Sequence, residues 1–215
     1  ADAVQALALL RDAGRGKALD PGRPEGPADA ARVRAILDRC RAEGRDPVLS
    51  EALEVVAAYG VPVAPWRSAD GPAAAAAAAA ELGFPVALKA VGPGLSHKSD
   101  VAGVCLGLPD AGAVVEAFAE MKVAVAERAP GSVMTGAVVQ VMAADGQDLI
   151  VGAKLDANFG HVVLAGLGGI FVEVLGDTAL RVAPFGRATA EALLRDLRTY
   201  PLLEGRRGQA AGDVP

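Results

Sequence analysis

A lysine interrupts an apolar segment of this chain and is followed at once by a loop of glycine and proline. Residues 84–91 read F-P-V-A-L-K-A-V, with Lys89 inside an otherwise apolar run. An ammonium group buried without a partner is costly, so such a lysine commonly faces an anion. Glycine lets the backbone of the following loop approach that anion closely. The pattern predicts a phosphate site on a strand, although a lysine that shields a sheet edge would give the same pattern.

The composition is that of a globular protein and argues against two classes of partner. Of the 215 residues, 52% are apolar and 22% are charged, and the net charge is −5. A negative chain does not favour binding to nucleic acid, and no apolar run reaches the roughly 20 residues that span a bilayer. Cys40 and Cys105 match neither a metal-ligand pattern nor a disulfide framework. We therefore expect reduced thiols in a cytoplasmic protein that binds neither nucleic acid nor membrane.

The predicted elements change in kind along the chain. The first half mixes helices with strands: helices at 28–43, 51–59 (capped by Ser50), 72–82 and 111–128, strands at 85–91, 101–108 and 137–142, and a short extended piece at 61–63. The second half is mostly hairpins, predicted at 149–155 with 161–167 and at 171–175 with 178–183, before a helix at 189–198. This order favours an α+β fold of two lobes around a cleft over a doubly wound sheet.

Several residues of the second half admit two interpretations. Asp156 and Asn158 resemble metal ligands, but the D-x-N-F-G spacing is better explained by turn chemistry. The neighbouring glycines would either form a tight turn or bring the backbone close to a phosphate or a partner's loop: Gly166, Gly168 and Gly169. Two charged residues of predicted strands would face either a cleft or solvent: Glu173 and Arg181.

Several motifs occur in an order typical of one family. The segments G-F-P-V-A-L-K-A, L-S-H-K-S-D-V-A-G-V and G-Q-D-L-I-V-G-A-K-L-D-A-N-F-G-H-V-V-L-A-G-L-G-G resemble the ATP-grasp portion of NDP-forming acyl-CoA synthetases. These are the ADP-forming acetate–CoA ligases, which are relatives of succinyl-CoA synthetase. The resemblance covers about residues 28–208 and implies an ATP-grasp fold whose two lobes enclose a nucleotide cleft. Its lobes would be 28–135 and 136–215, and residues 1–27 resemble the helix and linker that join the CoA-binding half in fused members.

The resemblance also implies a reaction and a partner. The family converts acyl-CoA, ADP and phosphate to a carboxylic acid, CoA and ATP through an acyl phosphate and a phosphohistidine. That phosphohistidine belongs to a CoA-binding module, which lies in the same parent chain or in a separate α subunit. We therefore expect this chain to meet the acyl-CoA or carboxylic acid only indirectly and to act as the nucleotide-binding part of an acid–thiol ligase.

By the same resemblance, two groups of residues take separate roles. Lys89 would contact nucleotide phosphates, the backbone of the hinge Gln140, Val141 and Met142 would contact the adenine edge, and Asp148 would lie near the ribose or base, where the family more often has glutamate. His97 would take the phosphoryl group from the partner and pass it to ADP, because a neutral imidazole is nucleophilic near pH 7. The flanking residues would assist, by offsetting charge and by orienting the ring: Lys98 and Asp100.

The sequence departs from the family pattern in two places. It has Val101-Ala102-Gly103-Val104 where the family has V-G-G-V, which replaces one glycine by alanine. The family also continues into a strand like E-I-D-L-N-P-L, which resembles the Mg²⁺ ligands of ATP-grasp enzymes. We assign no metal ligand in this chain, expect those ligands beyond its C-terminal end, and expect the chain to be a piece of a longer protein that is inactive alone.

Two other functions are compatible with parts of the sequence. The synthetase-like half occurs beside an acetyltransferase domain in some fused proteins that modify protein lysines, where it would be a regulatory module. A carboxylate–amine ligase is a third possibility, because ATP-grasp enzymes are diverse. The H-K-S-D motif argues against that possibility, since direct attack by an amine on an acyl phosphate needs no histidine relay. In isolation, His97 would be an ordinary loop histidine.

Overall fold

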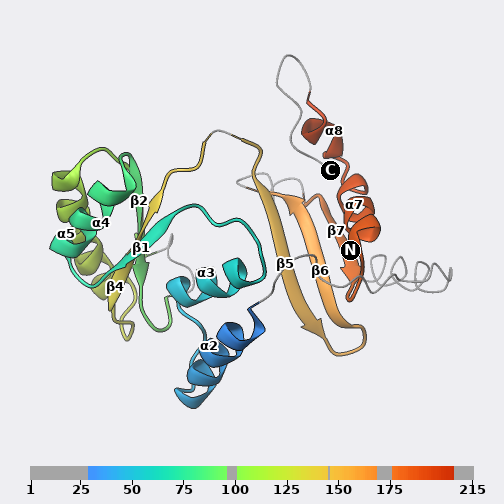
Figure 1. Ribbon diagram of the computed structural model, residues 1–215, viewed down its shortest axis with the longest axis horizontal. Helices are drawn as coiled ribbons and strands as arrows, with labels where there is room; N and C mark the ends of the chain where they lie inside the picture. The colour runs from blue at the N-terminus through green and yellow to red at the C-terminus, as the bar shows by residue number, and fades with distance from the viewer. Residues whose placement is uncertain (1–28, 96–100, 145, 169–175, 206–215) are drawn as a thin grey trace. The chain divides into compact units, whose positions relative to one another are not determined.

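The computed structural model describes residues 29–95, 101–144, 146–168 and 176–205. The chain divides into two units, one of Glu25–Ala144 and the other of Asp145–Pro215 together with Ala1–Pro24. In Figure 1 the first unit runs from blue to yellow and the described strands and helices of the second from orange to red. Within the described ranges, no helix is long and apolar enough to cross a membrane.

The first unit contains a four-stranded antiparallel sheet in the order β1-β4-β2-β3. Its strands are β1 (Trp66–Ala69), β2 (Val86–Val91), β3 (Val104–Leu108) and β4 (Gly136–Val141). Strand β4 pairs with β1 and β2, so it belongs to this unit, whereas the sequence placed the lobe boundary just ahead of it. Strand β1 lies at 66–69 rather than at the extended piece predicted at 61–63, because its position is set by antiparallel pairing with β4.

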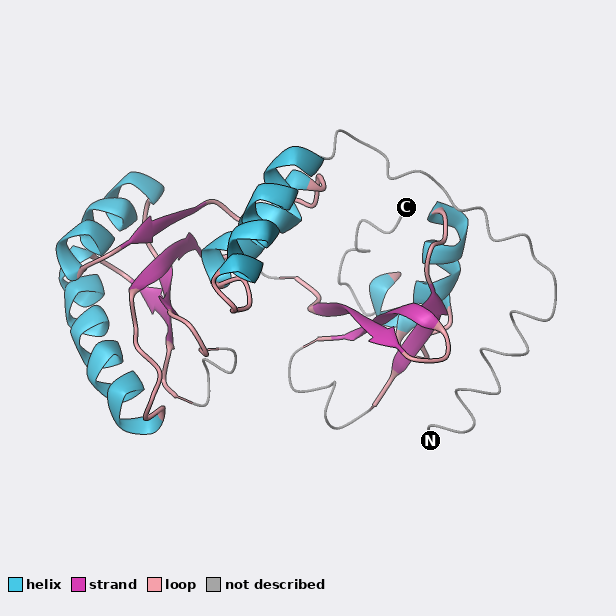
Figure 2. Cartoon of the chain, turned by 90° about the horizontal axis from the view of Figure 1, so that it is seen from below, coloured by secondary structure: helices cyan, strands magenta, loops and turns pink. Residues whose placement is uncertain are grey.

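Helices α4 (Pro72–Leu82) and α5 (Ala111–Arg128) pack on one face of this sheet (Figures 1 and 2). The alanine tract forms the predicted helix, with a proline in its first turn and a glycine after its last residue. Its buried positions recur at helical spacing and carry only methyl groups, which lets α4 lie close to α5: Ala75, Ala78 and Ala79. Larger side chains from α5 fill the same core: Val114, Phe118, Met121 and Val125.

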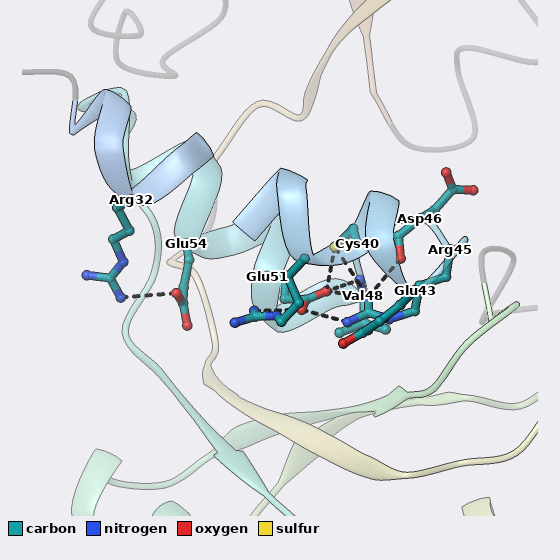
Figure 3. Close-up of polar contacts among 9 residues, drawn as sticks. Arg32, Cys40, Glu43, Arg45, Asp46, Val48, Glu51 and Glu54 are labelled. Carbon is teal, nitrogen blue, oxygen red and sulfur yellow. Dashed lines mark hydrogen bonds and ion pairs between the residues drawn. The ribbon is translucent and has the colours of Figure 1, made fainter. Parts of the chain in front are cut away.

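Helices α2 (Ala30–Ala42) and α3 (Leu49–Ala58) pack against each other in the same unit. Asp29 caps α2, its Oδ1 accepting a hydrogen bond from the N–H of Arg32 at 3.0 Å. The prediction that Ser50 caps α3 is wrong, because the helix begins at Leu49, two residues before the predicted start, and its N-cap is Val48. The carboxylate of Glu51 instead accepts a hydrogen bond from the N–H of Val48 at 3.0 Å (Figure 3).

The second unit contains a three-stranded antiparallel sheet in the order β5-β6-β7. Its elements are β5 (Leu149–Asp156), β6 (Gly160–Leu167), β7 (Thr178–Val182), α7 (Arg187–Arg195) and α8 (Tyr200–Leu203). Its small core joins the sheet to the α7 region and comprises Ala165, Ala179, Leu193 and Leu197.

The first predicted hairpin of this unit is confirmed. Strands β5 and β6 pair over their whole length, and Oδ1 of Asp156 accepts hydrogen bonds from the N–H groups of Asn158 (2.9 Å) and Phe159 (3.1 Å) in the turn. The 171–175 arm of the second predicted hairpin lies outside the described residues, while β7 pairs with β6. In place of the helix predicted at 189–198, the structure has α7, which starts and ends earlier, at 187–195. The short helix α8 follows it as a separate turn.

Candidate functional site

Lys89 and Gln140 lie on the sheet face that is turned away from α4 and α5. In the ladder between β2 and β4, Lys89 is opposite Val138 and Gln140 is opposite Ala87. Residues directly opposite each other share a sheet face, and so do residues two apart on one strand. Gln140 is two residues after Val138, the partner of Lys89, so Lys89 and Gln140 are diagonal neighbours on one face. The intervening Leu88 belongs to the core beneath the helices.

The two side chains are joined by a short hydrogen bond. Nζ of Lys89 donates to Oε1 of Gln140 at 2.7 Å, and Nε2 of Gln140 donates to the carbonyl of Ala64 at 3.1 Å. Gln140 is 8% exposed, and Lys89 is partly buried. Burial lowers the pKa of Lys89 from its ordinary value. Within the described ranges Lys89 makes no ion pair, so its positive charge is partly desolvated and uncompensated there.

The predicted hinge lies at the end of strand β4. Val141 is the last residue of the strand, and its N–H already donates to the carbonyl of Pro65 at 3.0 Å. Met142 is the first residue after the strand. Because the Val141 N–H is occupied inside the sheet, Met142 and the residues after it are better placed to offer backbone groups to a base. The adenine contact of residues 140–142 stays a prediction.

The glycine loop after Lys89 forms a tight turn. The N–H of Leu95 donates to the carbonyl of Gly92 at 3.3 Å, with Pro93 second and Gly94 third at φ +77°, as in a type II turn. A Cβ at Gly92 would lie 2.1 Å from the carbonyl oxygen of Val133, so only glycine fits. Leu95 is 6% exposed and belongs to the core, which fixes the point where the H-K-S-D segment departs.

His97, Lys98 and Asp100 lie outside the described residues, and their roles stay predictions. The chain is described again from Val101, which packs against the core of the first unit. The carbonyl of Gly103 accepts a hydrogen bond from the N–H of Ala90 at 2.8 Å, one residue after the lysine of the site. The described residues on both sides of the motif are therefore anchored to the same unit.

Asp148 lies in the second unit, so its contact with a ribose or base also stays a prediction. Its carbonyl accepts a hydrogen bond from the N–H of Gly168 at 2.7 Å. A Cβ at Gly168 would lie 2.8 Å from Cβ of Asp148, and a Cβ at Gly166 would lie 2.9 Å from the carbonyl oxygen of Asp177. Close packing inside the second unit therefore accounts for these two glycines, while Gly169 lies outside the described residues.

Two further charged residues of the second unit were candidates for the site, Arg181 and Glu173. The guanidinium of Arg181 forms an ion pair with Asp196 at the end of α7 and donates to the carbonyl of Leu180 at 2.8 Å. Glu173 lies outside the described residues. Nowhere in the described part of the chain do three or more histidine, cysteine, aspartate or glutamate residues gather to hold a metal ion. Because a nucleotide-bound Mg²⁺ takes most of its ligands from phosphates and water, this observation assigns no Mg²⁺ ligand among the described residues, and we derive no step through that ion.

A charged cluster between α2 and α3 contains the buried Cys40 (Figure 3). Its thiol donates to Oε2 of Glu51 at 3.5 Å, and Arg45 donates to both oxygens of that carboxylate at 2.7 and 2.9 Å. Burial and the hydrogen bond to Glu51 raise the pKa of Cys40. A nucleophilic cysteine needs a lowered pKa and access to solvent, so this cluster is structural.

Comparison with known proteins settles the family. A model of the ATP-grasp domain matches residues 39–215. The chain belongs to the ATP-grasp family. Over 179 residues it is 36% identical to the β subunit of ADP-forming acetate–CoA ligase I from Pyrococcus furiosus, which covers 83% of this chain and 77% of that subunit. Over 183 residues it is 38% identical to ADP-forming acetate–CoA ligase I from Archaeoglobus fulgidus, covering 85% of this chain and 27% of that protein.

The fold of this chain is also similar to that of a solved structure. The acetyl-coenzyme A synthetase 1 of Ca. Korarchaeum cryptofilum, described as dinucleotide-forming, superposes with a TM-score of 0.68 at 35% identity, over 85% of this chain and 78% of that one. That structure contains coenzyme A and Mg-AMPPCP, with its phosphohistidine segment pointing towards the nucleotide binding site. The family and the fold expected from the sequence motifs are confirmed.

The sequence analysis missed one part of the candidate site. It named Gln140 for its backbone, whereas the structure shows its side chain bonded to Lys89 and Ala64. A polar residue in the buried strand G-A-V-V-Q-V was the available signal, because a buried amide must find partners. The identity of the partners could not be read from the sequence, since Lys89 and Gln140 are 51 residues apart.

Proposed function

We propose that this ATP-grasp chain binds ADP or ATP, with the nucleotide phosphates on Lys89, as the nucleotide-binding part of an ADP-forming acyl-CoA ligase. The observation that carries the proposal is the Lys89 ammonium, partly buried, held by a neutral amide and without an ion pair in the described ranges. A polyphosphate is the kind of ligand that such a charge favours, since it makes charge-assisted hydrogen bonds.

His97 would relay the phosphoryl group. The P–N bond to the partner's histidine breaks as a P–N bond to His97 forms, and a terminal phosphate oxygen of ADP then displaces His97 to give ATP. Lys89 would stabilise negative charge on the nucleotide phosphates during that transfer. The phosphohistidine segment of the Korarchaeum enzyme points towards its nucleotide binding site, which supports phosphoryl transfer between a phosphohistidine and the nucleotide, while the relay through His97 rests on the H-K-S-D motif.

The partner would be a CoA-binding module that carries this phosphohistidine. One relative is a β subunit, and another is a longer chain of which this one covers 27%. Such a module could accordingly be a separate subunit or a fused part of the parent protein. The acyl group would be recognised there, and this chain would see only the phosphoryl group and the nucleotide.

Calorimetric titration with ADP tests the nucleotide site. Lys89→Ala removes a charged hydrogen-bond donor, which should weaken ADP binding at least about tenfold. Lys122→Ala, on the exposed side of α5, is the matched control and should bind as the parent chain does. Equal ADP affinity in all three proteins would refute the proposal.

The relay is tested by ATP formation from acyl-CoA, ADP and phosphate with the CoA-binding partner added. His97→Asn should abolish ATP formation while ADP binding is kept. His161, the other of the chain's two histidines, is exposed on β6 and provides the control. Full activity of His97→Asn would rule out the relay without affecting the nucleotide site.

A further inference from the structure

The side-chain amide of Gln140 has only one orientation that satisfies both of its neighbours. The ammonium of Lys89 can only donate a hydrogen bond, and the carbonyl of Ala64 can only accept one. The amide oxygen must therefore face Lys89 at 2.7 Å and the amide nitrogen must face Ala64 at 3.1 Å. Gln140 thereby ties the lysine of β2 to the segment that precedes β1.

The chemical type of this acceptor matters as much as its position. A glutamate at position 140 would form an ion pair with Lys89. Its second oxygen would then face the carbonyl oxygen of Ala64, and because both are acceptors no hydrogen bond could form between them. An amide orients the ammonium by a hydrogen bond but does not neutralise it. In the described part of the chain no acidic side chain pairs with Lys89, so the positive charge remains available for another anion.

We propose that Gln140 is a positioning residue that fixes the Lys89 ammonium on the sheet face while leaving its charge uncompensated for the phosphates of a nucleoside diphosphate. This inference rests on the proposed function, because it concerns the same lysine. Fixing the long side chain before the ligand arrives reduces the rotamer entropy that binding would otherwise cost. A neutral positioning group also spares the phosphate from competing with a carboxylate for the same donor.

Two substitutions separate positioning from charge. Gln140→Met keeps the bulk but removes both hydrogen bonds, and we expect ADP affinity to fall about fivefold. Gln140→Glu supplies a competing negative charge, and we expect ADP affinity to fall about tenfold or more. Nuclear magnetic resonance of the lysine ammonium groups should show the pKa of Lys89 raised in Gln140→Glu relative to the parent chain, with Lys122 unchanged. That shift tests only that residue 140 faces Lys89; a Gln140 that served the fold alone would leave the ADP affinity of a folded Gln140→Met unchanged.

The outcomes distinguish this inference from the proposed function. If Lys89→Ala loses ADP binding while both Gln140 variants bind ADP as the parent chain does, the positioning role is overturned and the nucleotide site stands. If Lys89→Ala binds ADP normally, both proposals are wrong. Thermal unfolding checks that the variants fold. If Gln140→Met does not fold, the parent chain still decides: ammonium protons of Lys89 that exchange with water as fast as those of Lys122 would overturn the inference.

Discussion

At the scale of single residues, Ala102 occupies a conformation that alanine disfavours. Its φ is +54°, and every other positive φ of the described chain belongs to glycine. A left-handed conformation costs a residue with a Cβ about 1–2 kcal/mol, while glycine gains roughly 0.4–1 kcal/mol of extra entropy in the unfolded chain. We therefore expect Ala102→Gly to stabilise the first unit by roughly 0.5–1 kcal/mol, measured by denaturant unfolding followed through the fluorescence of Trp66.

Gly107 provides the opposite substitution on the neighbouring strand β3. Its φ is +69°, and a Cβ placed there would meet nothing within 4 Å, so Gly107→Ala adds backbone strain without a clash. That change should destabilise the same unit by about 1 kcal/mol. A loss of stability in Ala102→Gly would show that φ at this position is not the source of strain. The V-A-G-V sequence indicated a missing glycine, but only the backbone angle shows which property was lost.

At the scale of elements, one buried carboxylate holds α2 and α3 together. Glu51 accepts hydrogen bonds from Arg45 and from the N–H of Val48 (Figure 3). It also accepts one from Arg39 at 2.8 Å, and its side chain is 10% exposed. The Arg45 guanidinium in particular holds the pKa of Glu51 far below its usual range, against the effect of burial. Glu51→Gln would remove the counter-charge of Arg39 and one of the two that Arg45 has, since Arg45 keeps its ion pair with Glu43, and we expect a loss of about 2 kcal/mol in the free energy of unfolding.

Glu54 is the matched control on the same helix. It pairs with Arg32 at 3.1 Å, but the two side chains are 33% and 58% exposed. An exposed ion pair contributes about 0–1 kcal/mol, so Glu54→Gln should change the stability little. Urea unfolding of the two variants compares them directly. Equal losses of stability would mean that burial of Glu51 does not determine how strongly the ion pairs stabilise α2 and α3.

The same elements show what the sequence could and could not predict. The alanine helix and the D-A-N-F-G turn were predictable because their causes are local: helix propensity in α4, and the Asp156 carboxylate bonding N–H groups two and three residues on. Strand β1 was not predictable in this way, since its place depends on pairing with β4. The Lys89–Gln140 bond belongs to the same class, because only the register between β2 and β4 brings the two side chains together.

At the scale of the whole molecule, the described part of each unit contains one buried carboxylate that is more acidic than usual. In the second unit, Asp177 accepts hydrogen bonds from the N–H groups of Arg198 at 3.1 Å and Thr199 at 2.8 Å, and from the Thr199 hydroxyl. Burial raises the pKa of Asp177, but these hydrogen bonds outweigh it and lower the pKa overall. Glu51 and Asp177 have no partner in common among the described contacts, so their contributions should add.

Both carboxylates make the chain sensitive to acid. A folded pKa below the unfolded value means that the unfolded state binds more protons, so stability is present at neutral pH and falls as the pH drops below about 4. Each group contributes a slope of up to about 1.4 kcal/mol per pH unit in that range. The single tryptophan, Trp66, lies in the first unit and reports on it alone. Denaturant unfolding at successive pH values, followed by Trp66 fluorescence, should lose much of its acid dependence in Glu51→Gln and keep it in Asp177→Asn. An unchanged pH profile in Glu51→Gln would mean that another group carries the acid sensitivity of the first unit, and a flattened profile in Asp177→Asn would mean that the two units unfold together.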